Sequence, residues 1–232
     1  MAHKVLHHHG QMSEAFRTVM FLSASGGLQD AYTYIGRGKV FANAQTGNIV
    51  LMSQAAFDGD LARVLHYLVP LLSFALGVAV AEAIHIRYRE AKRLHWRQLV
   101  LLVEILLLFG VGFIPNTLDL AANALVSFAC AMQVQAFRKV HSYPFASTMC
   151  IGNMRSGMES LVVYFHLHDK KVLHKALHYF GVILLFAFGA GVGAHCVGVF
   201  GNKTIWFSCA LLLVSLCFMF IQDEEEDLKE KA

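Results

Sequence analysis

Long apolar blocks with almost no charged residues constrain this chain more than any other feature of its sequence. Three blocks, Leu120–Phe137, Tyr179–Phe200 and Ile205–Ile221, carry no charge at all, and two others, Val69–Ile86 and Leu99–Ile114, carry one glutamate each. A helix needs about 20 mostly apolar residues to cross a bilayer. The blocks therefore predict an α-helical integral membrane protein. A soluble protein with buried core helices is disfavoured, because Tyr179–Phe200 lacks the polar face that such helices keep.

The blocks define six predicted spans and leave two more polar segments between them. The spans cover residues 17–36, 66–86, 97–115, 119–138, 178–200 and 204–221. The polar segments, about 40–57 and 143–165, are rich in small and polar residues. We expect an all-α, polytopic transmembrane helix bundle in which both polar segments are broken or re-entrant. A polar N-terminal tail, 1–16, and an acidic C-terminal tail, 223–232, would flank a single transmembrane domain, 17–222.

Short matches between the two halves of this domain indicate an internal repeat. The matches are Gly47-Asn48 with Gly152-Asn153, 105 residues apart, Gln29 with Gln133, 104 residues apart, and Phe74-Ala75-x-Gly77 with Phe186-Ala187-x-Gly189, 112 residues apart. The halves are about 15–116 and 117–222. If the polar segments turn back, each half has three spans and the second half is inverted relative to the first. If the segments cross, the chain has eight spans and its halves are parallel.

The placement of positive charge favours the six-span arrangement. With the N-terminus inside, fifteen of the nineteen Lys and Arg residues lie on the inner side and four lie outside, as the positive-inside rule requires. The eight-span arrangement divides them more evenly, ten inside and eight outside. Both arrangements place the two termini on one side, and we expect that side to be cytoplasmic. The first sixteen residues do not resemble a cleaved signal, so the first span should remain as an anchor.

The two polar segments carry the candidate functional residues. Their side chains supply hydrogen-bond donors and acceptors, and unwound backbone at membrane depth is tolerated only where protein buries it or a wet cavity adjoins it. One interpretation is a substrate or ion path formed where the segments meet near the midplane. The other is polar contacts that only join helices. The candidate path residues are Gln29, Asp30, Asn43, Gln45, Thr46, Gly47, Asn48, Gln133, Gln135, Gly152, Asn153 and Arg155.

Asp30 is the most costly of these residues, because it lies inside the first predicted span. A charge at that depth costs about 3 kcal/mol on insertion scales, so it needs a partner or a wet cavity. One hypothesis is a buried ion pair with Arg155 that joins the two halves. The alternative is that Asp30 carries a proton or binds a cation, as carboxylates do in secondary transporters. Glu104 and Glu159 are further acids that we expect to lie within the membrane.

Two neighbouring stretches carry a family resemblance. Gly27-Leu-Gln-Asp-Ala-Tyr-Thr-Tyr, followed by Phe41-Ala-Asn-Ala-Gln-Thr-Gly-Asn, resembles the signature of the DUF1275 family of YoaK-like bacterial membrane proteins. The resemblance covers essentially the whole chain, and it implies a bacterial cytoplasmic membrane location. The family pattern centres on Asp30 and Thr46-Gly47-Asn48, whereas the second half has Ile151-Gly152 in place of the Thr-Gly pair. The resemblance implies no activity, because the family is named for its unknown function.

Motifs for other functions are lacking from the sequence. It has no Cys-x-x-Cys or His-Glu-x-x-His spacing, no Walker motif and no Gly-x-Ser-x-Gly elbow, so we expect no metal site, no cofactor and no enzymatic activity. The basic cluster between residues 87 and 97 fits a topology signal better than a nucleic-acid site. Gly189 and Gly193 form a small-residue stripe that should let another helix approach closely.

The sequence thus leaves two functional hypotheses. The first is a transporter or channel-like protein that moves a small solute or ion through a polar site formed by the two Gly-Asn segments. The alternative is a non-transporting membrane scaffold or sensor that binds a lipid or another membrane protein. The lipid bilayer is the expected partner in both, no nucleic acid is expected, and the sequence is compatible with a homo-oligomer.

Overall fold

The computed structural model describes residues 9–88, 95–137, 139–140, 143–144, 148 and 150–230, and these residues are helical almost throughout. The helices are α1 (His9–Ala31), α2 (Gln45–Phe57), α3 (Leu61–Tyr88), α4 (Trp96–Val111), α5 (Asp119–Ala136), α6 (Cys150–Leu167), α7 (Lys170–Phe200) and α8 (Ile205–Glu230). Three short turns continue or join them: a π-helical turn η1 (Tyr32–Gly36) and two 3-10 turns, η2 (Asn116–Leu118) and η3 (Gly201–Thr204).

The predicted all-α class is confirmed, and one small hairpin joins two of the helices. Strands β1 (Lys139–Val140) and β2 (Tyr143–Pro144) pair antiparallel between α5 and α6, with Lys139 opposite Pro144. Within the predicted second polar segment, residues 145–147 lie outside the described part of the chain.

Several helices are longer than the apolar blocks predicted. α1 begins at His9, inside the predicted polar tail, and α8 continues to Glu230, through most of the predicted acidic tail; residues 1–8 and 231–232 lie outside the described residues. α3 and α7 also begin earlier than the predicted spans. An aspartate precedes each: Asp60 accepts from the N–H of Arg63 at 3.0 Å, and Asp169 accepts from the N–H of Lys171 at 2.9 Å. These caps begin the helices in the polar sequence before each apolar block.

The long helices of the bundle pack against one another. α1 packs against α7 and α8, α3 packs against α5, and α4 packs against α5 and α8. Some close approaches depend on glycine: a Cβ on Gly77 of α3 would overlap the carbonyl of Phe128, and a Cβ on Gly189 of α7 would overlap the carbonyl of Ala24. The buried apolar core lies mainly among α4, α5 and α8.

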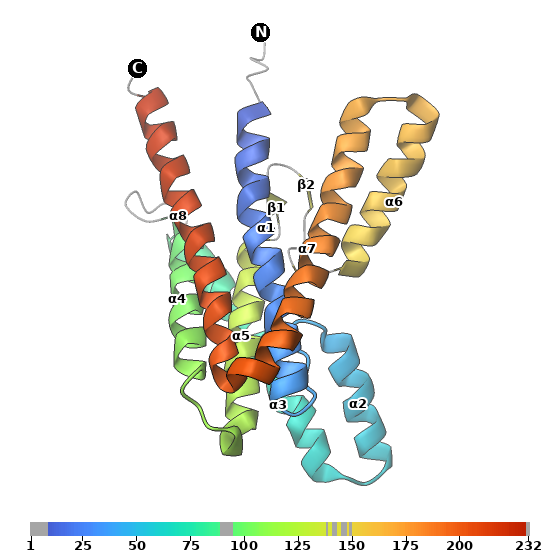
Figure 1. Cartoon of the computed structure of the whole chain (residues 1–232), viewed down its shortest axis with the longest axis vertical. Helices are drawn as coiled ribbons and strands as arrows, with labels where there is room; N and C mark the ends of the chain where they lie inside the picture. Colours follow the sequence, from blue (N-terminus) through green and yellow to red (C-terminus); the bar gives the residue numbers. More distant parts are fainter. Residues whose placement is uncertain are drawn as a thin grey trace.

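α2 and α6 are the outermost helices, and their main packing partners are α3 and α7 respectively. Figure 1 shows that both begin near the mid-height of the bundle and then run to opposite ends, α2 to the lower end and α6 to the upper end. α1 begins and α8 ends at the same, upper end (Figure 1). Each outer helix returns through a tight turn into the long helix that it packs against.

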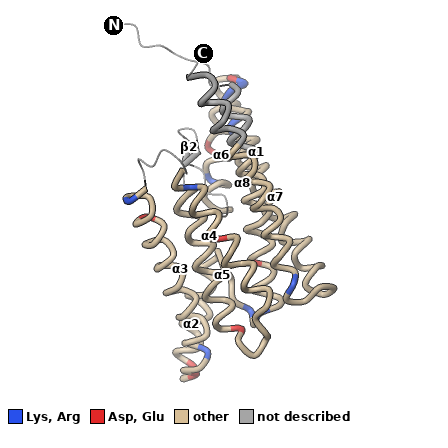
Figure 2. The backbone as a smooth tube through the Cα atoms, turned by 90° about the vertical axis from the view of Figure 1, so that its left-hand side faces the viewer, with Lys and Arg blue, Asp and Glu red and all other residues tan. Residues whose placement is uncertain are grey.

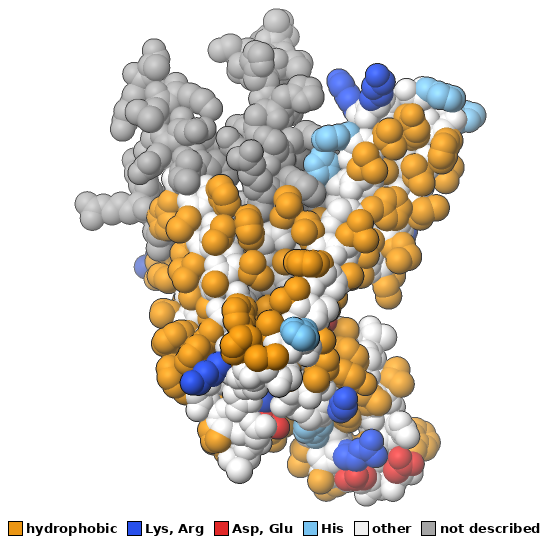
Figure 3. Space-filling model, in the orientation of Figure 1, with side chains coloured by type: hydrophobic (Ala, Val, Ile, Leu, Met, Phe, Trp, Pro, Cys, Tyr) orange, Lys and Arg blue, Asp and Glu red, His pale blue; other side chains and the backbone are white. Residues whose placement is uncertain are grey.

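The outer surface of the bundle is that of a membrane protein. Three helical stretches among the described residues are long and apolar enough to cross a membrane: Leu61–Tyr88, Asn116–Ala136 and Lys170–Phe220, the last of which includes α7, η3 and much of α8. Hydrophobic side chains cover most of the coloured face in Figure 3. Charged residues gather toward the two ends of the bundle and are sparse along its middle (Figure 2). The count of six spans and the internal repeat remain predictions.

Candidate functional site

The segment before α2 is held in shape by its own polar side chains. Asn48 accepts from the N–H of Phe41 at 3.0 Å and donates to the carbonyl of Phe41 at 2.7 Å, so one buried side chain satisfies both backbone groups. Gln45 donates to the carbonyl of Ala42 at 2.8 Å. A Cβ on Gly47 would lie 3.0 Å from the ring of Phe41, so glycine gives that ring room. Thr46, the remaining member of the signature, is exposed on the first turn of α2.

Asp30 lies against the N-terminus of α2. Its Oδ1 atom accepts from the backbone N–H of Asn43 at 2.7 Å. Asp30 is only 8% exposed. Asn43 lies two residues before α2, so the carboxylate is close to the N-terminus of this helix, where the positive end of the helix dipole favours an anion. Asp30 on α1 therefore holds the segment that leads into α2.

The segments that precede α2 and α6 meet at Gly26 of α1. Asn43 donates through Nδ2 to the carbonyl of Gly26 at 3.2 Å. Thr148, just before α6, presses its methyl group against the same residue, where a Cβ on Gly26 would overlap it. Asn43 Oδ1 and Thr148 Oγ1 are both buried and have no hydrogen-bond partner within the described ranges. Two short helices thus start beside one turn of α1, with polar oxygen atoms buried between them.

A second buried polar cluster lies one residue away, around Gln29. Its Nε2 atom faces Ser25 Oγ at 3.0 Å, Ser208 Oγ at 2.9 Å and Glu104 Oε1 at 3.3 Å, and its Oε1 atom accepts from the thiol of Cys130. Glu104 is fully buried, and its Oε2 atom has no hydrogen-bond partner in the described structure. These residues come from α1, α4, α5 and α8, so the cluster joins four helices.

The candidate residues of the second half are spread more widely. Gln133 is buried and faces the carbonyl of Leu22 on α1 at 3.4 Å, whereas Gln135 donates to the carboxylate of Glu82 on α3. Asn153 of α6 is buried, and a Cβ on Gly152 would meet nothing within 4 Å.

The predicted ion pair between Asp30 and Arg155 is wrong. Arg155 pairs with Glu159 on its own helix at 3.1 Å, and its side chain is 80% exposed. Arg155 and the buried Asn153 differ by two positions, which places them on different faces of α6. The partner of Asp30 is instead the backbone at the start of α2.

The two glycines of the predicted stripe both contact α1. A Cβ on Gly189 would overlap the carbonyl of Ala24, and a Cβ on Gly193 would lie 3.0 Å from the Cα and carbonyl oxygen of Leu28. Both contacts hold the backbone of α7 close to that of α1, beside the turn that carries Gly26 and Asp30.

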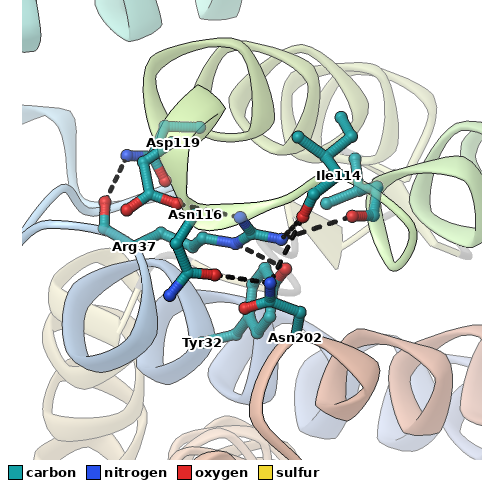
Figure 4. Close-up of polar contacts among 8 residues, drawn as sticks. Tyr32, Arg37, Ile114, Asn116, Asp119 and Asn202 are labelled. Atoms are coloured by element: carbon teal, nitrogen blue, oxygen red, sulfur yellow. Dashed lines mark hydrogen bonds and ion pairs between the residues drawn. The ribbon is translucent and has the colours of Figure 1, made fainter.

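Arg37 is a buried residue that the sequence reasoning did not single out. Its guanidinium is fully buried and donates to Tyr32 Oη at 2.8 Å, to Asp119 Oδ1 at 2.8 Å, and to the carbonyls of Val111 and Ile114 at 3.4 and 2.7 Å (Figure 4). Its own carbonyl accepts from Asn123. The sequence signal was weak, because an arginine between two glycines resembles an exposed loop residue. The cluster ties the end of η1 to both α4 and α5.

A pocket of about 660 Å³ lies next to this cluster, between residues 112–116 and residues 199–203. Asn202 hydrogen bonds to Asn116 and to the carbonyl of Ile114 there. The residues that line this pocket do not include Asp30, Asn43 or Asn48.

The site has two buried carboxylates in the middle of a membrane protein. Neither Asp30 nor Glu104 forms an ion pair with a Lys, Arg or His of the described residues. Carboxylates so placed can exchange a proton or bind a cation. No group of three or more His, Cys, Asp and Glu residues suited to a metal ion occurs in the part of the chain that the structure describes.

Comparisons with known proteins agree with this description of a helical membrane protein. The sequence profile of DUF1275, a protein family of unknown function, matches residues 18–218. A curated relative, the UPF0700 transmembrane protein YoaK of Bacillus subtilis (strain 168), is 26% identical over 209 residues, which are 85% of this chain and 92% of the relative. No solved structure matches the chain. Because the profile covers nearly all of the helical bundle, this membrane protein belongs to the DUF1275 family.

Proposed function

We propose that the chain crosses the membrane six times and that α2 and α6 are re-entrant half-helices of two inverted repeats. The opposite directions of α2 and α6 in Figure 1 support this arrangement. The close glycine contacts also support it: Gly77 meets Phe128, and Gly189 meets Ala24. Gly77 and Gly189 are 112 residues apart, and Ala24 and Phe128 are 104 apart, so the two contacts are equivalent under the repeat.

Contacts that recur in this way are expected where two halves of a chain are related by a two-fold axis. Such an axis in the membrane plane is the arrangement of many transporters built from inverted repeats.

We infer that the protein is a transporter-like membrane protein rather than an enzyme, and that it moves a small solute or ion through the junction of the half-helices. The observation that carries this proposal is the buried Asp30 carboxylate at the N-terminus of α2. Half-helix ends at the midplane and intramembrane carboxylates are the parts from which secondary transporters build substrate and ion sites. The buried oxygen atoms of Asn43 and Thr148 add polar groups beside this carboxylate.

The second buried carboxylate gives the proposal a coupling element. Gln29 is adjacent to Asp30 in sequence and donates to Glu104 at 3.3 Å. A proton or cation that neutralises Asp30 would weaken its hydrogen bond to the segment before α2. A resulting shift of α1 would reach Glu104 through the hydrogen bond from Gln29. We propose that movement would occur along the contacts of α1 with α7 and of α3 with α5, where glycine lets the helix backbones approach closely.

Proton flux into proteoliposomes tests the proposal. Vesicles loaded with the pH dye pyranine are held at a potassium diffusion potential with valinomycin, and small organic acids, amines and sugars are added one class at a time. We expect one class to drive proton movement in the unmodified protein. Asp30→Asn and Glu104→Gln should reduce that movement to the level of protein-free vesicles. Asp58→Asn, at the exposed turn between α2 and α3, is the matched control and should retain it.

The same experiment can reject transport. If no solute class moves protons faster than in protein-free vesicles, or if Asp30→Asn and Glu104→Gln behave like the unmodified protein, the proposal fails. A non-transporting scaffold would then be the better account of the junction. Gel filtration of each variant in detergent shows that any loss of flux does not come from misfolding.

A further inference from the structure

The outward face of α6 is unusual for a helix at the surface of a membrane protein. The helix contacts α7, and its buried residues are Asn153, Gly157 and Ser160. Another face carries Arg155 and Glu159, which form an ion pair at 3.1 Å with side chains 80% and 61% exposed. Both charges therefore face whatever surrounds the bundle.

The depth of this ion pair makes contact with lipid costly. α6 begins near the mid-height of the bundle (Figure 1), and Arg155 is five positions after Cys150. At a rise of about 1.5 Å per residue, Arg155 lies only about 8 Å along the helix from its start. Half the hydrocarbon thickness of a bilayer is about 15 Å. Charged side chains at such depths face protein or water rather than lipid.

The surroundings of the ion pair suit close contact with another helix. Gly152 and Ser156 lie one turn apart beside it, and a Cβ on Gly152 would meet nothing within 4 Å. A small residue at this position is unexplained by packing within the chain, and small residues four apart let the backbones of two membrane helices approach. Large apolar side chains flank the stripe, with Ile151 85% and Met158 48% exposed.

We propose that this face of α6 is the interface between two copies of this chain, related by a two-fold axis. This face carries one positive side chain, Arg155, and one negative side chain, Glu159, a single turn apart. The charge pattern of the face is therefore complementary to itself. Across a two-fold axis Arg155 can bind the partner's Glu159, and Glu159 can bind the partner's Arg155. The exchange keeps both charges paired and removes them from lipid, while Gly152 and Ser156 allow the two helices to approach.

A charge-mixing experiment tests this interface. The variant Glu159→Arg makes the stripe wholly basic, and the variant Arg155→Glu makes it wholly acidic. We expect each variant alone to be monomeric in detergent and in nanodiscs, because like charges then meet across the axis. When the two variants are co-expressed with different affinity tags, they should co-purify as a mixed dimer, whereas the unmodified chain should dimerise with itself.

Mixing also separates a broken interface from a broken fold, because a misfolded variant would not recover a partner. The proposal is overturned if the unmodified chain is monomeric in nanodiscs, which would favour a lipid or another protein on this face. It is also overturned if each variant dimerises alone as well as the unmodified chain does, or if the two variants do not combine.

Disulfide cross-linking locates the contact independently. In a background with the five cysteines replaced by serine, a single cysteine at Ile151, which is 85% exposed at the start of α6, should cross-link two chains under mild oxidation. The matched control is a cysteine at Leu106, which is 63% exposed on α4. Figure 1 shows α4 on the other side of the bundle from α6, so this variant should stay monomeric. Equal cross-linking at both positions, or none at Ile151, contradicts the proposed interface.

Discussion

At the scale of single residues, the polar groups near Asp30 divide into those that fix the backbone and those that remain free to act. Asn48 uses its carbonyl and its amide on the backbone of Phe41. Asp30, in contrast, holds the start of α2 by a charge that a proton or cation could neutralise. The signature around these residues thus combines a structural clamp with the carboxylate on which the proposed transport depends.

The clamp leads to a stability prediction. Asn48→Ala leaves the N–H and C=O groups of Phe41 without their side-chain partner, and an unsatisfied buried group costs about 1–3 kcal/mol. We expect the variant to lose about 2 kcal/mol of unfolding free energy, measured by SDS titration in mixed micelles. Ser53→Ala on the same helix removes only an exposed bond to the carbonyl of Ile49 and should change stability by less than about 0.5 kcal/mol. Equal losses in both variants would show that Asn48 is not a clamp.

Arg37 supports a second prediction at this scale. Its guanidinium bonds to four separate groups, and a lysine at this position could not reach them all in one geometry. We expect Arg37→Lys to cost about 3 kcal/mol, because breaking a buried pair leaves groups without partners. Asp119→Asn should cost only about 1 kcal/mol, since Arg37 keeps its other partners and the Asp119 side chain is 26% exposed. The same SDS titration measures both, and a smaller loss in Arg37→Lys than in Asp119→Asn would contradict this account.

At the scale of helices, the glycine contacts should limit how α7 packs on α1. Gly189→Leu would push against the backbone of Ala24, and overpacking a tight contact costs about 1–3 kcal/mol. We expect a clear fall in the thermal unfolding midpoint in detergent. Gly191→Leu, on the same helix, is the matched control, because a Cβ there meets nothing within 4 Å. If both substitutions lower the midpoint equally, the close approach of α1 and α7 does not stabilise the fold.

Sequence reasoning identified most of the helical regions but not all of their limits. The polar segments around Asn48 and Asn153 form α2 and α6. The sequence separates them from the long apolar blocks because they contain glycine and amide residues. The starts of α3 and α7 were missed, because their first turns are polar and depend on caps from Asp60 and Asp169. Hydrophobicity does not detect such caps.

The candidate site was predictable in composition but not in pairing. Asp30 and Arg155 both looked like membrane charges in need of a partner, yet Arg155 lies on an exposed face of α6 beside Glu159. Which face a side chain occupies depends on how α6 packs against α7, and the sequence alone does not contain that packing. For the same reason Glu104 was noticed as an acid, whereas its contact with Gln29 was not.

At the scale of the whole molecule, the distribution of charge bears on orientation. The upper end in Figure 1 includes the turn between α6 and α7 with Lys170 and Lys171. The six-span arrangement assigns fifteen Lys and Arg residues to the side of the two termini and four to the other side. This excess favours a cytoplasmic upper end.

This orientation makes a prediction about the two tight turns. Asp58 lies at the exposed turn between α2 and α3, and Lys170 lies at the exposed turn between α6 and α7, at opposite ends of the bundle (Figure 1). In a cysteine-free background, we expect a membrane-impermeant thiol reagent to label Asp58→Cys only from outside intact cells and Lys170→Cys only after the cells are opened. Re-entrant half-helices require this result, because each returns to the side that it entered from.

The eight-span arrangement predicts that both cysteines are labelled from the same side. If residues 40–57 and 143–165 crossed the membrane fully, the two halves would be parallel and both turns would lie on one side. Labelling of Asp58→Cys and Lys170→Cys from the same side would therefore reject the inverted repeat and, with it, a midplane junction of two half-helices. Opposite-side labelling together with a flux-free junction would instead retain the inverted fold while removing transport. The topology of this chain and its activity can thus be decided separately.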